Sequence, residues 1–253
     1  MSILPIQKHI RSLADPLRAK NSLWFFKTSK GDYGYGDKFL GFNVPTARKI
    51  AKQYLLSRGT LDSKSDFWKE VEVLICSPYH EERQIALFIL VGKYEKGDLA
   101  EQTKVYKFYL KHTKWINNWD LVDTSAPKIV GHYLSQKSEG RSFRLDRRDV
   151  LYKLAKSKNL WERRIAIIST LYFIIKKKQF TETKALAEIL LNDKHDLIHK
   201  AVGWMLREMG KMSVANLTAW LKKHYKKMPR TMLRYSIEKF PLEIRQAYLR
   251  GEI

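Results

Sequence analysis

Hydrophobic residues recur at intervals of three and four along most of the chain, which is the spacing of one face of an α-helix. Strict alternation of apolar and polar residues, the pattern of a half-buried strand, is not found in any convincing run. Short connections rich in Asp, Asn, Lys and Gly separate the helical segments, and one longer loop lies at 31–36. The sequence therefore predicts an all-α fold with helices at 44–55, 81–94, 98–111, 118–134, 148–156, 160–177, 181–191, 195–209, 214–226, 229–239 and 241–249.

A small residue recurs inside every second predicted helix, often with polar or basic residues before it and apolar residues after it. Successive members are 39, 40, 40, 35 and 35 positions apart. A small residue lets neighbouring helix pairs approach closely, and this period is typical of HEAT-like repeats. We predict a single HEAT-like repeat domain over residues 1–253, with about six helix pairs forming a curved α-solenoid. The small residues are Ala47, Ala86, Ala126, Ala166, Ala201 and Ser236.

The charge of the chain is strongly positive, with 48 Lys and Arg against 26 Asp and Glu, a formal net charge of +22. The cations are distributed through the predicted helices instead of forming one tail. Such a distribution favours a broad basic surface that follows a phosphate backbone. We expect the concave face of the solenoid to be basic and to bind double-stranded DNA, although a ribosome-associated protein or one at an anionic membrane would share this charge.

Several classes of protein are disfavoured by what the sequence lacks. The chain has one cysteine, Cys76, which excludes a disulfide framework and a cysteine-ligated zinc site. The longest apolar stretch, 165–175, is too short to span a bilayer, and the N-terminus has no apolar signal core. The seven histidines show no ligand spacing, and we expect most of them at surface or capping positions. We therefore expect a cytoplasmic protein without a membrane partner, a cofactor or a metal.

Five polar and aromatic residues from three consecutive repeats form the strongest candidate site. Trp119 and Asp123 are four residues apart and so share one helix face. Arg163 and Arg164 precede the small residue of a later helix, and Trp204 follows the small residue of the next repeat. A tryptophan at helical spacing is more often a core residue, and an aspartate beside arginines is usually a structural ion pair. The spacing alone leaves both interpretations open.

Three motifs at the repeat spacing make the sequence similar to a known family. They are 119–123 (WDLVD), 161–167 (WERRIAI) and 200–208 (KAVGWMLRE), and 39–45 (FLGFNVP) precedes them. Together they resemble the bacterial alkylpurine DNA glycosylases of the AlkD type, which are built from HEAT-like repeats. The resemblance covers most of the chain from Phe39 onward.

The resemblance implies roles for particular residues. Trp119 and Trp204 match the tryptophans that face the lesion, and Asp123 matches the catalytic aspartate. The spacing of the second motif selects Arg164 over Arg163 as the arginine that contacts DNA.

Further expectations concern residues in or near these motifs. We expect Arg163, Lys200 and Arg207 to contribute to the DNA backbone contact as well. The family site also includes an N-terminal aromatic residue, for which Trp24, Phe25 and Phe26 are candidates.

The function implied is that of a monofunctional glycosylase. It would hydrolyse the N-glycosidic bond of cationic N3- or N7-alkylated purines in duplex DNA without flipping the base into a deep pocket, as a monomer. Asp123 would stabilise the positive charge that develops on the sugar, the tryptophans would contact the cationic base, and Arg164 would clamp a phosphate. Two alternatives are a catalytically silent DNA-binding protein and a scaffold for an acidic protein or RNA.

Overall fold

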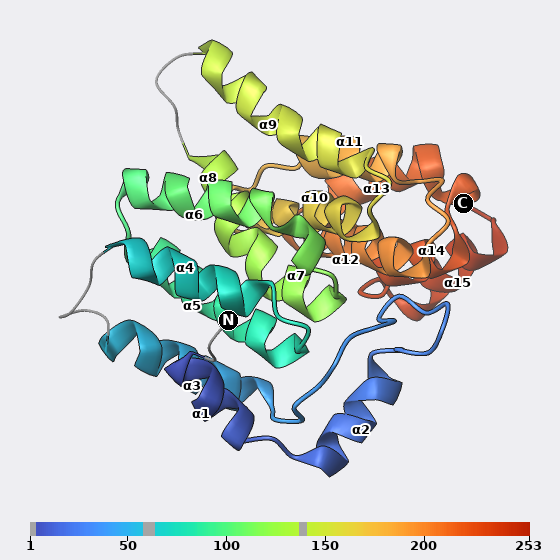
Figure 1. The fold of residues 1–253 in the computed structure, drawn as a ribbon. Helices are drawn as coiled ribbons and strands as arrows, with labels where there is room; N and C mark the ends of the chain where they lie inside the picture. The colour runs from blue at the N-terminus through green and yellow to red at the C-terminus, as the bar shows by residue number, and fades with distance from the viewer. Residues whose placement is uncertain (1–3, 58–63, 137–140) are drawn as a thin grey trace. The chain divides into compact units, whose positions relative to one another are not determined.

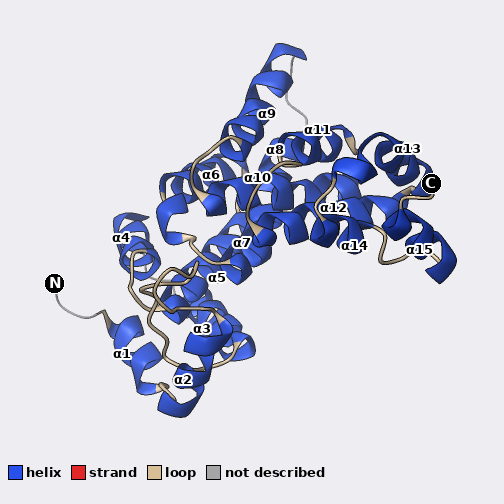
Figure 2. Ribbon diagram, turned by 90° about the vertical axis from the view of Figure 1, so that its right-hand side faces the viewer, coloured by secondary structure: helices blue, strands red, loops and turns tan. Residues whose placement is uncertain are grey.

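The computed structural model describes residues 4–57, 64–136 and 141–253, with side chains for all of these except 64–65 and 141–147. Figure 2 shows that the described residues form helices and loops without a strand. An isolated bridge joins Lys38 to Tyr79. The all-α prediction is therefore confirmed. The segment 137–140, which precedes the predicted 148–156 helix, lies outside the described residues.

Most helices follow one another with short connections, and a long loop at 26–43 joins α2 to α3 (Figure 1). None of the helices in the described part of the chain has the length and hydrophobicity needed to cross a bilayer. Their bounds are α1 (Pro5–Ser12), α2 (Pro16–Phe25), α3 (Val44–Ser57), α4 (Lys64–Ile75), α5 (His80–Lys96), α6 (Leu99–Lys111), α7 (Trp119–Ala126), α8 (His132–Ser135), α9 (Arg141–Ala155), α10 (Leu160–Tyr172), α11 (Thr181–Ile189), α12 (Asp196–Met212), α13 (Val214–His224), α14 (Arg230–Ser236) and α15 (Leu242–Arg250).

Three of these helices were missed by the sequence analysis. Helix α2 buries none of its residues and α1 has only eight residues, so neither carries a long apolar face for periodicity to reveal. Helix α4 does carry one, since Phe67, Val71 and Leu74 are buried at helical spacing. The remaining helices lie where the hydrophobic pattern predicts them, within a few residues at their ends, except that α9 begins at Arg141, seven residues before the predicted start.

The chain divides into two compact units, Met1–Leu121 and Val122–Ile253. In the first unit, α5 packs against α3, α4 and α6. In the second, α10 packs against α9, α11 and α12, and α12 packs against α13 and α14. Each unit is thus a stack of helices in which every second helix contacts its counterpart in the next repeat.

The six small residues of the repeat are buried on alternate helices. They belong to α3, α5, α7, α10, α12 and α14, and each is at most 1% exposed. A larger side chain at such a position would push the neighbouring helix away from a densely packed core. The structure is therefore a helical repeat fold, as the spacing predicts.

Two loops of the repeat are braced in the same way, one before α5 and one before α10. Ser77 and Ser157 each accept a hydrogen bond at their hydroxyl from the amide two residues later, at 3.1 and 3.0 Å. Arg83 donates to the carbonyl of Ser77 at 2.9 Å, and Arg163 donates to that of Ser157 at 3.0 Å. We call this arrangement the serine–arginine brace.

The segment 119–135 is helical throughout but widens in the middle. It begins as α7, passes through a π-helical turn at Pro127–Gly131 and ends as α8. Pro127 has no N–H, so it cannot donate the bond that a regular α-helix would give to the carbonyl of Asp123. Widened turns of this kind often occur beside functional residues, and this one begins four residues after the last residue of the WDLVD motif.

Two glycines with the same backbone conformation give a test of how α2 is attached. Gly41 and Gly36 have φ angles of +89° and +90°, but a Cβ on Gly41 would lie 2.2 Å from the carbonyl oxygen of Asp15, whereas one on Gly36 meets nothing within 4 Å. Gly36→Ala should lower the free energy of unfolding by about 1 kcal/mol through strain alone. Gly41→Ala should lower it clearly further, as measured by urea unfolding, and equal losses would contradict the close approach.

Candidate active site

Asp123 and Arg164 form a two-point ion pair in the second unit. The Nε and Nη2 atoms of Arg164 donate to the two carboxylate oxygens of Asp123 at 2.9 and 2.7 Å. The remaining Nη1 donates to the carbonyl of Leu197 at 2.6 Å. The pair therefore joins α7, α10 and the first turn of α12. Parallel pairing of this kind is the strongest and most directional form of arginine–carboxylate contact.

The burial of the two side chains differs in a way that assigns their roles. Arg164 is 6% exposed at its side chain, whereas Asp123 is 16% exposed. The guanidinium is thus directed inward and binds within the protein, while the phosphate contact expected of Arg164 stays a prediction. Its contact with both oxygens orients the carboxylate of Asp123.

Trp204 lies on the same helix as the carbonyl that anchors Arg164. It follows Leu197 by seven residues, which places both on one face of α12, about 10 Å apart along the helix axis. The indole is half-buried, and its Nε1 donates to Glu208 Oε1 at 3.1 Å. This hydrogen bond holds the ring edge and leaves a ring surface accessible.

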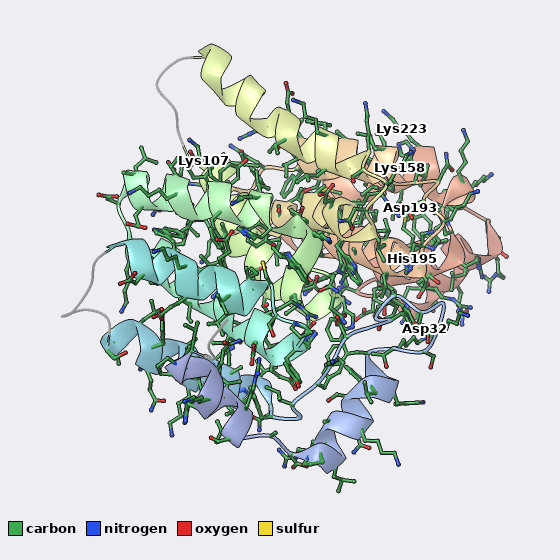
Figure 3. The ribbon with its side chains drawn as sticks, in the orientation of Figure 1. Asp32, Lys107, Lys158, Asp193, His195 and Lys223 are labelled. Carbon is green, nitrogen blue, oxygen red and sulfur yellow. The ribbon has the colours of Figure 1, made fainter. Side chains whose placement is uncertain are left out.

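Arg163, for which a DNA contact is also expected, is held by partners within the protein. Its Nε donates to Asp193 at 2.6 Å, and its Nη1 donates to the carbonyls of Ser157 and Lys158. The side chain therefore ties together the loops before α10 and α12. Its partners Lys158 and Asp193 are labelled in Figure 3. These loops carry three exposed lysines, Lys156, Lys158 and Lys194, of which Lys158 is itself a partner of Arg163 and Lys194 directly follows its partner Asp193.

The other two expected backbone contacts, Lys200 and Arg207, also take part in ion pairs. Lys200 Nζ lies 2.7 Å from Asp196, one turn earlier in α12. Arg207 binds Glu238 and lies 3.4 Å from Glu208. Lys200 is 40% exposed and Arg207 18%, so neither cation is presented to solvent alone.

In the first unit, Trp119 has two aromatic neighbours from the N-terminal region. Its ring centroid lies 5.8 Å from that of Phe26 in a stacked arrangement and 6.0 Å from that of Phe25 in an edge arrangement. Trp24 is 84% exposed. Of the three N-terminal candidates, Phe25 and Phe26 are therefore placed beside Trp119, which begins α7 four residues before Asp123.

A buried charged cluster lies next to Trp119, and the sequence analysis missed it. Asp120 Oδ2 is 2.8 Å from His80 Nε2 and accepts from Gln84 at 2.9 Å, while His80 Nδ1 lies 3.6 Å from Asp37. The ring of His80 also packs on Phe26. Burial opposes the charged imidazole, but the carboxylates of Asp120 and Asp37 outweigh it and raise the pKa of His80 to about 9.

The signal for this cluster was present in the repeat register. His80 and Asp120 are 40 residues apart and each precedes its small residue by six positions, so the fold places them in adjacent repeats. The described residues hold no group of three or more His, Cys, Asp or Glu that is arranged to bind a metal ion. The cluster is therefore best understood as a buried ion network that supports the helix start at Trp119.

Comparison with known proteins gives the family. A family model described as DNA alkylation repair enzyme matches residues 6–240. The chain belongs to this family. A solved structure described as a predicted DNA alkylation repair enzyme from Enterococcus faecalis matches with a TM-score of 0.69 and 18% identity, over 90% of this chain and 97% of that chain. At this identity the likeness establishes the fold. Comparison with curated proteins gives no match.

Membership of the DNA alkylation repair enzyme family makes DNA the partner of this chain. It also accounts for the excess of 22 positive charges, since a polyanionic partner offsets the repulsion among them.

The His80 cluster predicts how the stability of this repair-family protein depends on pH. Because the pKa of His80 is about 9 in the folded state and near 6.5 when unfolded, its contribution is complete below pH 6.5 and is lost as pH rises through 9. His80→Gln should lower the thermal midpoint at pH 6 and reduce its fall between pH 6.5 and 9. His9→Gln, at an exposed histidine, serves as the control. Equal pH profiles for wild type and His80→Gln would exclude the buried imidazolium.

Proposed function

We propose that this protein is a monofunctional DNA glycosylase that hydrolyses the N-glycosidic bond of cationic N3- or N7-alkylated purines in duplex DNA. The observation that carries the proposal is the Asp123–Arg164 pair, in which a partly exposed carboxylate is fixed by a buried guanidinium. Family membership supports action on alkylated DNA. The glycosidic bond and the two alkylation positions are the finer part of the proposal.

The chemistry of an alkylated purine suits a single carboxylate. Alkylation at N3 or N7 makes the base cationic, so it leaves as a neutral molecule and needs little acid catalysis. Positive charge then develops on the sugar, and a nearby anion of fixed orientation stabilises that charge without reorganising. Asp123 supplies this anion, and its orientation is fixed by the two hydrogen bonds from Arg164. No covalent amine intermediate is required, so lyase activity is not expected.

The tryptophans contribute attraction for the cationic base. A cation over an indole face is stabilised by about 0.5–2 kcal/mol, and an uncharged base lacks this cation–π attraction. Trp119 and Trp204 are both half-buried, so each presents part of its ring to solvent. Because Asp123 and both indoles are reachable from solvent, the proposal does not require the base to enter a deep pocket.

We assign the DNA backbone contact in the second unit to lysines of the loops before α10 and α12. Arg163 and Arg164 use their guanidinium groups within the protein, whereas Lys158 and Lys194 are exposed on the loops that Arg163 ties together. The compact ammonium on a flexible stem suits exposed phosphate oxygens. The two arginines then act by positioning, one for the carboxylate and one for the loops.

Release of N7-methylguanine and N3-methyladenine from defined duplexes tests both the glycosylase activity and the role of the Asp123 carboxylate. Asp123→Asn should lower the single-turnover rate at least about 100-fold while retaining DNA binding, because it removes the anion that faces the developing charge. Asp193→Asn is the matched control, since it disrupts the neighbouring aspartate–arginine pair. Both variants should melt earlier than wild type, and only Asp123→Asn should lose activity.

The possible outcomes distinguish the role of Asp123 from the glycosylase activity of the protein. Equal activity of Asp123→Asn and wild type would retain the glycosylase and remove Asp123 from the reaction. Failure of the wild type to release either base would favour the alternative of a DNA-binding protein without catalysis.

The loop lysines predict a change in salt dependence. Each lysine that neutralises one phosphate contributes about 0.9 to the slope of log binding constant against log salt concentration. Lys158→Ala and Lys194→Ala should each reduce the slope by about this amount, as measured by fluorescence anisotropy. Lys239→Ala is the control, because Lys239 Nζ is already 3.2 Å from Glu238. An unchanged slope in both loop variants would place the backbone contact elsewhere.

A further inference from the structure

Helix α2 presents apolar side chains to solvent. None of its ten residues is buried, and Leu17, Trp24 and Phe25 are 73%, 84% and 55% exposed. The helix is nevertheless well defined at its start, where the carboxylate of Asp15 accepts a hydrogen bond from the backbone amide of Arg18 at 3.0 Å. Exposed aromatic groups gathered on one ordered element commonly mark a binding surface.

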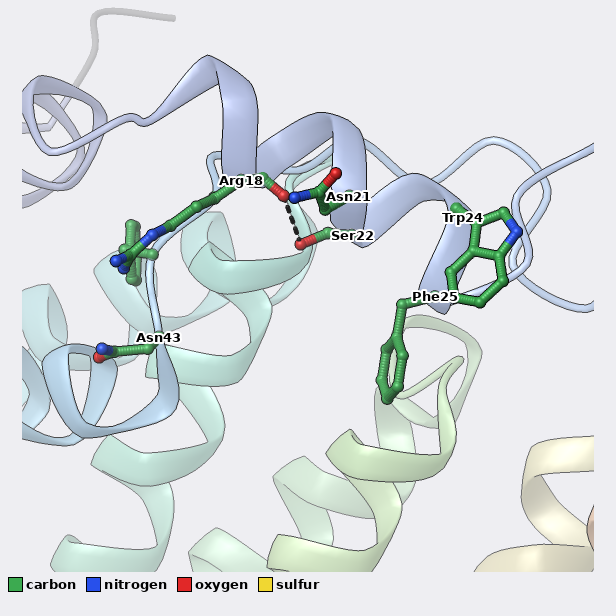
Figure 4. Close-up of a pocket in the computed structure, with 8 residues that line it drawn as sticks. Arg18, Asn21, Ser22, Trp24, Phe25 and Asn43 are labelled. Atoms are coloured by element: carbon green, nitrogen blue, oxygen red, sulfur yellow. Dashed lines mark hydrogen bonds between the residues drawn. The ribbon is translucent and has the colours of Figure 1, made fainter.

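A hollow of about 680 Å³ lies between α2 and the chain that leads into α3 (Figure 4). Figure 4 shows Arg18 and Asn43 at one side, Trp24 and Phe25 at the other, and Asn21 and Ser22 between them. The volume lies in the range of small-ligand sites. The wall combines aromatic rings with amide groups and one guanidinium: Trp24, Phe25, Phe42, Asn21, Asn43 and Arg18.

The charge of the two segments that form this hollow is entirely positive. Neither α2 nor 41–57 contains Asp or Glu. Arg18 Nε lies 3.4 Å from the carboxylate of Asp15, which is just before α2. The occupant should therefore carry negative charge as well as flat apolar surface. Arg18 is the cation in the wall of the hollow, and the cations elsewhere on these segments are Lys20, Arg48, Lys49 and Lys52.

We propose that this hollow binds an unpaired nucleotide of DNA, with its base against Trp24 and its phosphate near Arg18. Aromatic side chains can stack on a base only when it is outside the double helix, because a paired base is already covered on both faces. The amides of Asn21 and Asn43 offer donors and acceptors to a base edge. A fully paired duplex offers none of its bases to such a surface.

The position of the hollow connects it with the candidate active site. Phe25 lines the hollow and also lies 6.0 Å from Trp119, within the same unit. The proposal extends the proposed glycosylase, since the nucleotide held here is a different one from the lesion, displaced where the duplex opens beside Trp119. Binding of unmodified DNA tests it without any glycosylase reaction, so the failure of one does not imply the failure of the other.

The test compares a short labelled duplex with one extra thymidine in one strand against the same duplex without it, by anisotropy at one fixed salt concentration. Wild type should bind the bulged duplex more tightly than the paired duplex. Trp24→Ala should weaken binding to the bulged duplex about five- to a hundredfold, the usual cost of losing one stacked base, and leave the paired duplex nearly unaffected. Arg18→Ala should also weaken the bulged complex.

Two matched variants control for surface charge and aromatic content. Tyr35→Ala removes an aromatic side chain that is 65% exposed but does not line the hollow, and Lys20→Ala removes an exposed cation from the same helix. Both should keep the preference for the bulge. Circular dichroism and the thermal midpoint should match wild type for Trp24→Ala, because α2 buries none of its side chains. Equal binding of the two duplexes by wild type, or a preference that survives in Trp24→Ala, would overturn the proposal.

Discussion

The close approach of alternate helices at one buried small residue sets the register on which everything else in this protein depends. Three positions before that residue, successive repeats carry Arg83, Asp123 and Arg163. Arg83 and Arg163 fold back onto the loop before their own helix as serine–arginine braces. Asp123 occupies the same place but accepts from Arg164 instead. The candidate catalytic carboxylate thus replaces an arginine at a repeat position that in the neighbouring repeats maintains loop structure.

Sequence reasoning located most helices that bury an apolar face, with α4 as an exception, and it failed for α2, which buries no residue. Periodicity located α5 and α12 because burial demands it, but α2 buries nothing and therefore left no pattern. The WDLVD and WERRIAI motifs identified Asp123 and Arg164 but not the direction of the guanidinium. That direction depends on the Leu197 carbonyl, which comes from a distant helix. The structural role of Arg163 was recoverable, because Arg83 precedes it by two whole periods with the same serine six residues earlier.

The positive charge of the protein is divided between two kinds of side chain. Arginines of the motifs are used inside the second unit, where their planar groups bind a carboxylate and a carbonyl at once. Lysines remain at the surface and provide the excess that attracts DNA. In the first unit, His80 adds a buried positive charge between two carboxylates. The net positive charge therefore indicates that the partner is DNA, whereas the candidate site depends on a few charges that are paired with opposite charges inside the protein.

The three contacts of Arg164 make the site conditional on cooperative folding. One guanidinium joins α7, α10 and α12, so the carboxylate of Asp123 is oriented only when three consecutive repeats are assembled. Repeat arrays fray from their ends, and here α14 packs on α12 while α15 packs on α14. The terminal helices can therefore open and close without disturbing the carboxylate, whereas a chain interrupted before α12 would retain Asp123 and lose its orientation.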